Sequence, residues 1–195
     1  MTMDSRTLTG SRVILEPLSL AHVDALCEIG LDPEIWRYTT SRVRNRDDMV
    51  LYVETALQWQ REGTAVPFAT IDRASKRVVG SSRFANIAPE HKRAEIGWTW
   101  IARDFQRTHV NTEAKYLMLC LAFEQWKYHR VELKTSSRNE RSRAAILRLG
   151  AVEEGTLRKH MINSDGSSRD SVYFSITDDE WPAVKAKMEN MMGHS

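Results

Sequence analysis

The sequence predicts one α/β domain built around a mixed, mostly antiparallel sheet. The 195 residues are close to one domain's worth of chain, and the 42% hydrophobic and 28% charged residues are typical of a globular protein. Hydrophobic periodicity changes between that of strands and that of helices in the order β-α-α-β-β-β-α-β-α-β-β. No internal repeat, low-complexity segment or linker interrupts this order. We therefore expect a single domain over residues 1–195, with about seven strands flanked by about four helices.

The first half of the chain predicts a strand, two helices and then three strands. Residues 12–16 form a short apolar strand, and Ser19 is placed to cap the helix that follows. A second helix is expected over residues 47–63, where apolar side chains recur with the period of one buried stripe. The three strands are expected at residues 66–71, 77–84 and 94–101. Polar turns between them predict an antiparallel meander.

The third of these strands is expected to have two chemically different faces. Its apolar side chains recur at every second position, namely Ala94, Ile96, Trp98 and Trp100. Because side chains alternate across a strand, we expect Glu95 and Thr99 on the face opposite the two tryptophans.

The second half of the chain predicts alternating helices and strands. A helix that is apolar nearly all round is expected over residues 111–126, with Asn111 or Thr112 as its cap. A short helix begins at Asn139 and is closed by Gly150. The other expected elements are strands at residues 130–135, 152–162 and 171–176 and a last helix at residues 181–191.

The patterns of charge and hydropathy exclude several functional classes. The 28 basic and 26 acidic side chains are mostly interspersed, so no basic block favours nucleic-acid binding. The longest apolar run, residues 116–123, is far shorter than the roughly 20 residues that cross a bilayer. Cys27 and Cys120 lie in apolar stretches and are expected to be buried, reduced thiols. We therefore expect a cytoplasmic protein that binds neither nucleic acid nor membrane.

The sequence carries no motif for a metal site, a serine hydrolase or a nucleotidase. His22, His91, His129 and His160 are scattered without the spacing of metal ligands. Neither a Gly-x-Ser-x-Gly elbow nor a Gly-Lys-Ser/Thr run occurs. We expect no metal in the site.

The junction between residues 99 and 113 is the most informative part of the sequence. A strand ends there, a loop with Arg103 and Arg107 follows, and a long helix begins. Backbone N–H groups at a helix N-terminus are unpaired and bind anions, and two arginines suit a diphosphate. A helix with a purely structural cap has the same features, so this junction alone leaves both interpretations open.

A second junction in the sequence also leads from a strand through a short loop into a helix. After a buried strand, Arg138-Asn-Glu-Arg-Ser142 begins a short helix that ends at Leu149-Gly150. Together the two junctions resemble the GNAT superfamily of acyl-CoA-dependent N-acyltransferases, over about residues 8–181. Within it, the chain is most similar to the ribosomal-protein N-terminal acetyltransferase (RimJ/RimL-like) branch. The segments that carry this likeness are Leu8-Thr-Gly-Ser-Arg-Val-Ile-Leu-Glu-Pro-Leu18, Glu95-Ile-Gly-Trp98 and Arg138-Asn-Glu-Arg-Ser142.

The resemblance implies a splayed sheet and a coenzyme A cofactor, acetyl-CoA or free CoA. In the superfamily the first junction holds the pyrophosphate and the second flanks the pantetheine arm. The residues that match the cofactor-binding positions are Trp100, Ile101, Ala102, Gln106, Arg107, Thr108, His109, Val110, Asn111, Thr112, Asn139, Ser142 and Arg143.

One segment departs from the pattern of the superfamily. Its pyrophosphate loop reads glutamine/arginine-x-x-glycine-x-glycine/alanine, whereas Gln106-Arg-Thr-His-Val-Asn111 has larger residues at both small positions. Asparagine tolerates left-handed conformations and caps helices, so Asn111 is a suitable substitute. His109 either donates to a phosphate or points to solvent.

The resemblance also implies direct attack of an amine on the thioester, with no covalent enzyme intermediate. The backbone N–H groups matched to the pantetheine amide and thioester oxygen are those of Trp100, Ile101 and Ala102. Glu95 is the candidate general base, because a carboxylate shielded by tryptophan can accept a proton directly or through water. The alternative is a surface glutamate paired with an arginine or lysine. Many relatives have a tyrosine where this chain has Ile146, so Ser142 is the nearest polar group to protonate or orient the leaving sulfur.

Trp36 and Tyr38 lie between the first two helices, where the superfamily builds its acceptor cleft. Arg42 and Arg44 follow, and aromatic side chains with nearby arginines suit a peptide terminus or an acid-bearing small acceptor. A loop packed by one buried tryptophan would have the same sequence. The expected activity is acetyl transfer to a primary amine, either a protein N-terminus or a small molecule.

Two other functions are compatible with the same fold. Transfer to an aminoglycoside or an amino-acid-like compound would require an acidic cleft, which the sequence does not supply. A non-catalytic acyl-CoA-binding or sensing protein would suit the altered loop and the missing tyrosine. A homodimer is common in this branch and is compatible with the exposed aromatic residues.

Overall fold

The computed structural model describes residues 6–193, and within them eight strands form one mixed sheet in the order β1-β2-β3-β4-β5-β6-β8-β7. The strands are β1 Leu8–Thr9, β2 Val13–Pro17, β3 Val66–Asp72, β4 Arg77–Ala88, β5 Arg93–Ile101, β6 Arg130–Ser136, β7 Val152–Ile162 and β8 Ser168–Thr177. The helices are α1 Val23–Gly30, α2 Pro33–Trp36, α3 Arg46–Arg61, α4 His109–Cys120, α5 Glu140–Leu149 and α6 Trp181–Met192. No helix in this part of the chain has both the length and the apolar character needed to cross a membrane.

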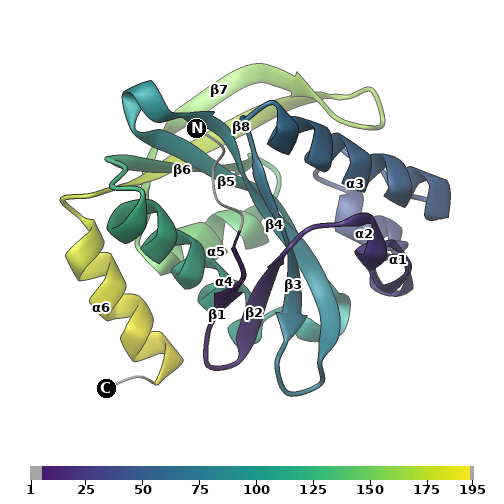
Figure 1. Ribbon diagram of the computed structural model, residues 1–195. Coiled ribbons are helices and arrows are strands. Elements are labelled where there is room, and N and C mark those ends of the chain that lie inside the picture. Colours follow the sequence, from purple (N-terminus) through teal and green to yellow (C-terminus); the bar gives the residue numbers. More distant parts are fainter. Residues whose placement is uncertain (1–5, 194–195) are drawn as a thin grey trace.

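The sheet separates two apolar cores, with α1, α2 and α3 on one face and α4, α5 and α6 on the other (Figure 1). The core beside α3 includes Leu26, Trp36, Met49, Tyr52 and Val53. The core beside α4 includes Phe68, Phe84, Met118, Leu149, Phe174 and Met188. Cys27 and Cys120, which we expected to be buried, are free and only half-buried at the edges of these cores.

The predicted order of elements is confirmed, with two short elements added. The two-residue β1 and the four-residue α2 are too short to produce a periodic pattern. The antiparallel meander is confirmed by the register of β3 with β4 and of β4 with β5. Helix α4 begins at His109, earlier than expected, because Thr108 caps it: its Oγ1 accepts from the N–H of Val110 at 3.3 Å. Neither Asn111 nor Thr112 is the cap.

The expectation for the two faces of β5 is wrong. The core beside α4 contains Ala94 and Ile96, whereas the core beside α3 contains Trp98 and Trp100. The register of β4 with β5 shifts between Ser81 and Arg83, and Trp98 has a φ of 48°, so a β-bulge reverses the alternation here. Consequently Thr99 contacts α4, whereas the lysine bonded to Glu95 lies near the Trp98 ring.

β5 and β6 form the only parallel pair of strands within residues 6–193. Their pairing is short and runs from Arg93 opposite Arg130 to Glu95 opposite Glu132. Beyond this point β5 continues to Ile101 and β6 to Ser136 without pairing to each other. The splayed sheet that the family resemblance implied is therefore present.

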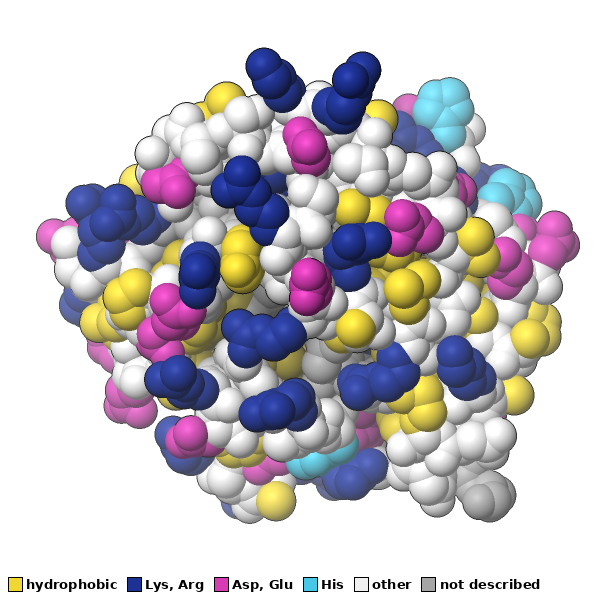
Figure 2. All heavy atoms as spheres, turned by 180° about the vertical axis from the view of Figure 1, so that it is seen from behind, with side chains coloured by type: hydrophobic (Ala, Val, Ile, Leu, Met, Phe, Trp, Pro, Cys, Tyr) yellow, Lys and Arg dark blue, Asp and Glu magenta, His cyan; other side chains and the backbone are white. Residues whose placement is uncertain are grey.

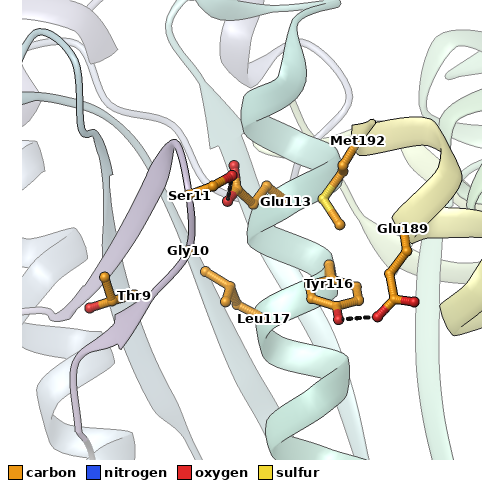
Figure 3. Close-up of a pocket in the computed structure, with 8 residues that line it drawn as sticks. All are labelled: Thr9, Gly10, Ser11, Glu113, Tyr116, Leu117, Glu189 and Met192. Atoms are coloured by element: carbon orange, nitrogen blue, oxygen red, sulfur yellow. Dashed lines mark hydrogen bonds between the residues drawn. The ribbon is translucent and has the colours of Figure 1, made fainter. Parts of the chain in front are cut away.

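Helix α4 carries a buried carboxylate that fastens the N-terminal hairpin. Glu113 is 2% exposed, and its Oε1 accepts from the N–H of Arg12 at 3.0 Å and from Ser11 Oγ at 2.9 Å. It lines a cavity of about 250 Å³ between the hairpin, α4 and α6, where Tyr116 donates to Glu189 at 2.6 Å (Figure 3). Because both carboxylates already have donors, this cavity is a structural junction rather than a candidate site.

The same helix buries a lysine that has no acidic partner. Lys115 is 5% exposed, and its Nζ donates to Ser82 Oγ at 3.1 Å and to Thr99 Oγ1. No carboxylate of the described residues lies within ion-pair distance of it. Burial therefore lowers the pKa of Lys115 to about 7.

Replacing Glu113 by alanine is expected to lower the free energy of unfolding by about 1–3 kcal/mol, because buried donors lose their acceptor. Urea unfolding measures this change. Glu28→Ala, on the exposed side of α1, is the control and should change stability by less than about 0.5 kcal/mol. A loss at Glu113 no larger than that of the control would contradict the structural role.

Lys115→Met is expected to stabilise the protein at neutral and acidic pH. An unfolded lysine keeps its proton up to about pH 10.5, whereas the folded Lys115 loses it near pH 7. Folding thus releases a proton between these values, so the stability of the wild type should rise with pH there. The variant should lack this rise and gain at most about 5 kcal/mol at pH 6.

Urea unfolding at pH 6, 8 and 9.5 tests this expectation. Lys187→Met, on the exposed side of α6, is the control and should keep the dependence on pH of the wild type. An unchanged slope in Lys115→Met would show that this lysine stays protonated in the folded protein.

Candidate active site

A cavity of about 580 Å³ opens where β5 and β6 diverge. Its lining extends from the loop before α4, past the free edges of the two strands, to Arg169 on β8. Helix α5 and the segment from Glu34 to Ser41 complete the wall. The divergence of two neighbouring strands therefore creates the cavity.

The loop before α4 forms one end of this cavity. Gln106 Nε2 donates to the carbonyl oxygen of Ile101 at 3.1 Å, which ties the loop to β5. Arg107 has a φ of 60°, so it takes the left-handed conformation that the sequence analysis assigned to Asn111. Asn111 instead lies in the first turn of α4 and lines the cavity together with Thr108. The unpaired N–H groups of this turn suit an anion.

His109 takes neither of the two expected orientations. Its Nε2 is buried and lies 3.3 Å from Oδ1 of Asp72 on β3. Its side chain does not line the cavity. The histidine in the altered loop therefore packs against the sheet and leaves the helix terminus accessible.

Four other expected cofactor residues do not line the cavity. These are Ala102, Val110, Thr112 and Arg143. The N–H of Ala102 donates to the carbonyl of Val79 at 2.8 Å, so it is not free for a ligand, and that expectation is wrong. Arg143 lies 3.4 Å from Glu153, away from the cavity. Trp100 and Ile101 do line the cavity.

Glu95 lies at the point where the two strands part. It is 2% exposed, and its Oε2 accepts from Asn86 Nδ2 at 2.8 Å and from Lys134 Nζ at 3.0 Å. Its Oε1 has no hydrogen-bond partner among the described residues, and a Cβ on Gly97 would lie 2.9 Å from it. Gly97 therefore leaves room beside the free oxygen. Glu95 is paired with a lysine, as the alternative interpretation held, but it is buried in the cavity wall rather than exposed.

The start of α5 has the geometry that the sequence indicated. Asn139 Oδ1 accepts from the N–H of Ser142 at 3.1 Å, and Gly150 closes the helix with a φ of 111°. Asn139, Ser142 and Ile146 all line the cavity. The second junction of the sequence therefore meets the first across one cavity.

The two predicted acceptor residues have different environments. Trp36 is 4% exposed and donates from Nε1 to the carbonyl of Gly30 at 2.7 Å, so most of its ring belongs to the core. Tyr38 is half-buried and lines the cavity. Arg42 and Arg44 do not line it, and Arg44 pairs with Asp48.

Three cations that line the cavity were not predicted from the sequence: the buried Lys115 and Arg169 and the partly buried Lys134. A lysine within the apolar helix α4 was a usable signal for Lys115. Lys134 and Arg169 gave no signal, because their burial depends on the placement of β8 between β6 and β7.

The charged lining of the cavity is mostly basic. Its basic residues are Arg107, Lys115, Lys134, Arg141, Arg148 and Arg169, and its acidic residues are Glu34 and Glu95. Figure 2 shows Lys and Arg side chains gathered around a hollow on the face opposite to that of Figure 1. A basic cavity attracts anionic ligands.

Comparisons with known proteins agree with this geometry. A crystal structure of a T. thermophilus protein, assigned as an acetyltransferase, matches with 36% identity and a TM-score of 0.90 over 98% of this chain and 100% of that chain. The Bacillus subtilis (strain 168) protein YdaF, assigned as a ribosomal N-acetyltransferase, is 35% identical over 100 residues, 51% of this chain and 54% of its own length.

A third relative carries a coenzyme A compound. Mycobacterium smegmatis RimJ in complex with CoA-disulfide shares the fold, with a TM-score of 0.79 and 24% identity over 93% of this chain and 90% of that chain. The likeness to YdaF agrees with the resemblance to the ribosomal N-acetyltransferase branch that the sequence indicated, whereas RimJ shows the shared fold. Residues 12–152 match the family described as "Acetyltransferase (GNAT) domain". The chain therefore belongs to the GNAT acetyltransferase family.

Proposed function

We propose that this protein transfers an acetyl group from acetyl-CoA to a primary amine by direct attack on the thioester. The observation that carries the proposal is the cavity between β5 and β6, which joins a helix N-terminus at one end to Glu95 at its apex. An anion site and a carboxylate with one free oxygen are the two parts that this reaction needs.

The residues of the cavity fit a coenzyme A ester. The first turn of α4 and the guanidinium of Arg107 would bind the pyrophosphate, and Arg141 and Arg148 add positive charge along the lining. The unpaired edge of β5 near Trp100 and Ile101 would hold the pantetheine arm and orient the thioester carbonyl. The bound ester supplies the activated acyl carbon.

Glu95 is the proposed general base. Lys134 and Asn86 hold its Oε2, so Oε1 is the oxygen that can accept a proton from the amine, directly or through water. As the new C–N bond forms and the C–S bond breaks, the leaving sulfur needs a proton. Ser142 lines the cavity and is the proposed group that orients the sulfur or passes it a proton.

Two other functions compete with this proposal: acetyl transfer to an aminoglycoside, and acyl-CoA binding without catalysis. An aminoglycoside is a polycation and would be repelled by Lys134 and Arg169, so this acceptor class is disfavoured. A non-catalytic acyl-CoA-binding protein is the remaining alternative. The free oxygen of the buried Glu95 favours the enzyme, since ligand binding alone does not need it.

Acetyl-CoA and free CoA are expected to raise the melting temperature in a concentration-dependent way, because both bind the folded state. A thermal-shift titration measures this. Arg107→Gln should weaken the shift, whereas Arg158→Gln, on the exposed strand β7, should not. The absence of any shift at millimolar ligand would rule out the proposed cofactor site.

Glu95→Gln is expected to lower kcat by about 10²-fold or more, because an amide cannot accept the proton of the amine. Release of free thiol from acetyl-CoA, followed from pH 6 to 9, measures the effect. Glu90→Gln, in the exposed turn between β4 and β5, is the matched control and should retain activity. Turnover by Glu95→Gln equal to that of the wild type across this range would exclude Glu95 as the base.

A further inference from the structure

The end of the cavity beside Glu95 contains more buried positive charge than the proposed cofactor site and base require. Lys134 and Arg169 both line it, and Arg169 is 8% exposed. Arg83 is 1% exposed and does not line the cavity, but it lies near the Trp98 ring that Lys134 also approaches. Its guanidinium is 4.7 Å from the ring centroid of Tyr52 and 5.5 Å from that of Trp98. Three cations therefore share this region with one carboxylate.

Of the two cations that line the cavity here, Arg169 has the less complete hydrogen bonding. Its Nη1 donates only to the carbonyl of Tyr38, at a long 3.4 Å, and its buried Nε has no partner. No carboxylate within residues 6–193 forms an ion pair with it, and Glu95 already pairs with Lys134. Burial lowers the pKa of Arg169, although an arginine still stays charged.

A buried guanidinium without an ion-pair partner is costly, because its charge is removed from water. Glu95 attracts Arg169 but is already paired with Lys134, so the charge of Arg169 is offset only in part. An amine that enters this end as an ammonium ion would add one more positive charge. An anionic group on the acceptor would compensate the charge of Arg169 and would also offset the positive charge of the incoming ammonium ion. A carboxylate matches the planar donor fork of arginine and can accept two hydrogen bonds from it.

We propose that the acceptor is an amine that carries a carboxylate close to its amino group, and that Arg169 binds this carboxylate while the amine faces Glu95. This inference rests on the proposed acetyl transfer and specifies its substrate class. Tyr38 lines the same cavity, and its carbonyl accepts from Arg169, so its ring is available to pack against the acceptor. Arg169 thus takes the role that the sequence analysis gave to Arg42 and Arg44.

Matched pairs of acceptors test the proposal in the wild-type protein. One pair is an L-amino acid and its carboxamide; the other is a C-terminally amidated peptide that begins with aspartate and the same peptide with asparagine. Thiol release from acetyl-CoA should show kcat/KM at least about tenfold higher for the acid in one pair, because a charged hydrogen-bonding partner is gained. A preference for the acid in the first pair would indicate a free amino acid as the acceptor, and a preference in the second pair would indicate a peptide. Equal rates within both pairs would overturn the inference.

Variants of Arg169 give the second test. Arg169→Gln should bring the ratio of acid to amide close to one by raising KM for the acid, and Arg169→Lys should give an intermediate ratio. Arg158→Gln removes the same charge outside the cavity and should keep the ratio of the wild type. Thermal melting checks that each variant folds. A preference for the acid that survives in folded Arg169→Gln would contradict the assignment of Arg169.

A binding measurement separates this inference from the proposed function. Calorimetric titration of the same acceptors into the protein saturated with free CoA needs no turnover. Tighter binding of the acid that is lost in Arg169→Gln, without thiol release, would uphold the carboxylate site and reject the transferase. Thiol release with both acceptors of a pair, at equal rates and with equal affinities, would uphold the transferase and reject the carboxylate site.

Discussion

The short parallel pairing of β5 with β6 is the constraint on which the rest of the molecule depends. It ends at Glu95 opposite Glu132, so the two strands continue with free edges facing each other. Helix α4 follows the end of β5 and helix α5 follows the end of β6, which brings both helix N-termini to this opening. Ligands bind outside the carboxyl ends of parallel strands for the same topological reason. The early end of the pairing between β5 and β6 therefore creates both the cavity and its anion site.

The β-bulge at Trp98 determines which groups face that opening. Without it, Thr99 would share a face with Glu95, and Lys115 would lose one of its two hydroxyl partners. With it, the strand presents Glu95 on the side of Lys134 and presents Thr99 to α4. Bulges often serve to redirect a side chain beside an active site. Here the bulge separates the carboxylate from the buried lysine of α4.

The sequence predicted the secondary structure, which depends on local patterns of residues. It did not predict the side-chain orientation and burial that depend on contacts between distant parts of the chain. Periodicity located nearly every strand and helix, and the short helix α5 was located because Asn139 and Gly150 mark its start and its end. The cap of α4 was misplaced because Thr108, Asn111 and Thr112 are all favourable cap residues, and Asn111 is the best of them in isolation. The faces of β5 could not be derived, since a bulge leaves no pattern in one strand. The burial of Arg169 depends on the order β6-β8-β7, which no local pattern specifies.

The positive charges beside Glu95 affect the protonation of the acceptor's amine as well as the binding of its carboxylate. In the proposed reaction the nucleophile is the uncharged amine, and nearby cations disfavour its ammonium form. Lys134 and Arg169 would therefore promote loss of the amine proton to Glu95, but on their own they would also repel the incoming acceptor. A carboxylate on the acceptor resolves this conflict, because its attraction to Arg169 holds the substrate while the amine lies beside the cations. The same positive charge then supports both recognition and deprotonation.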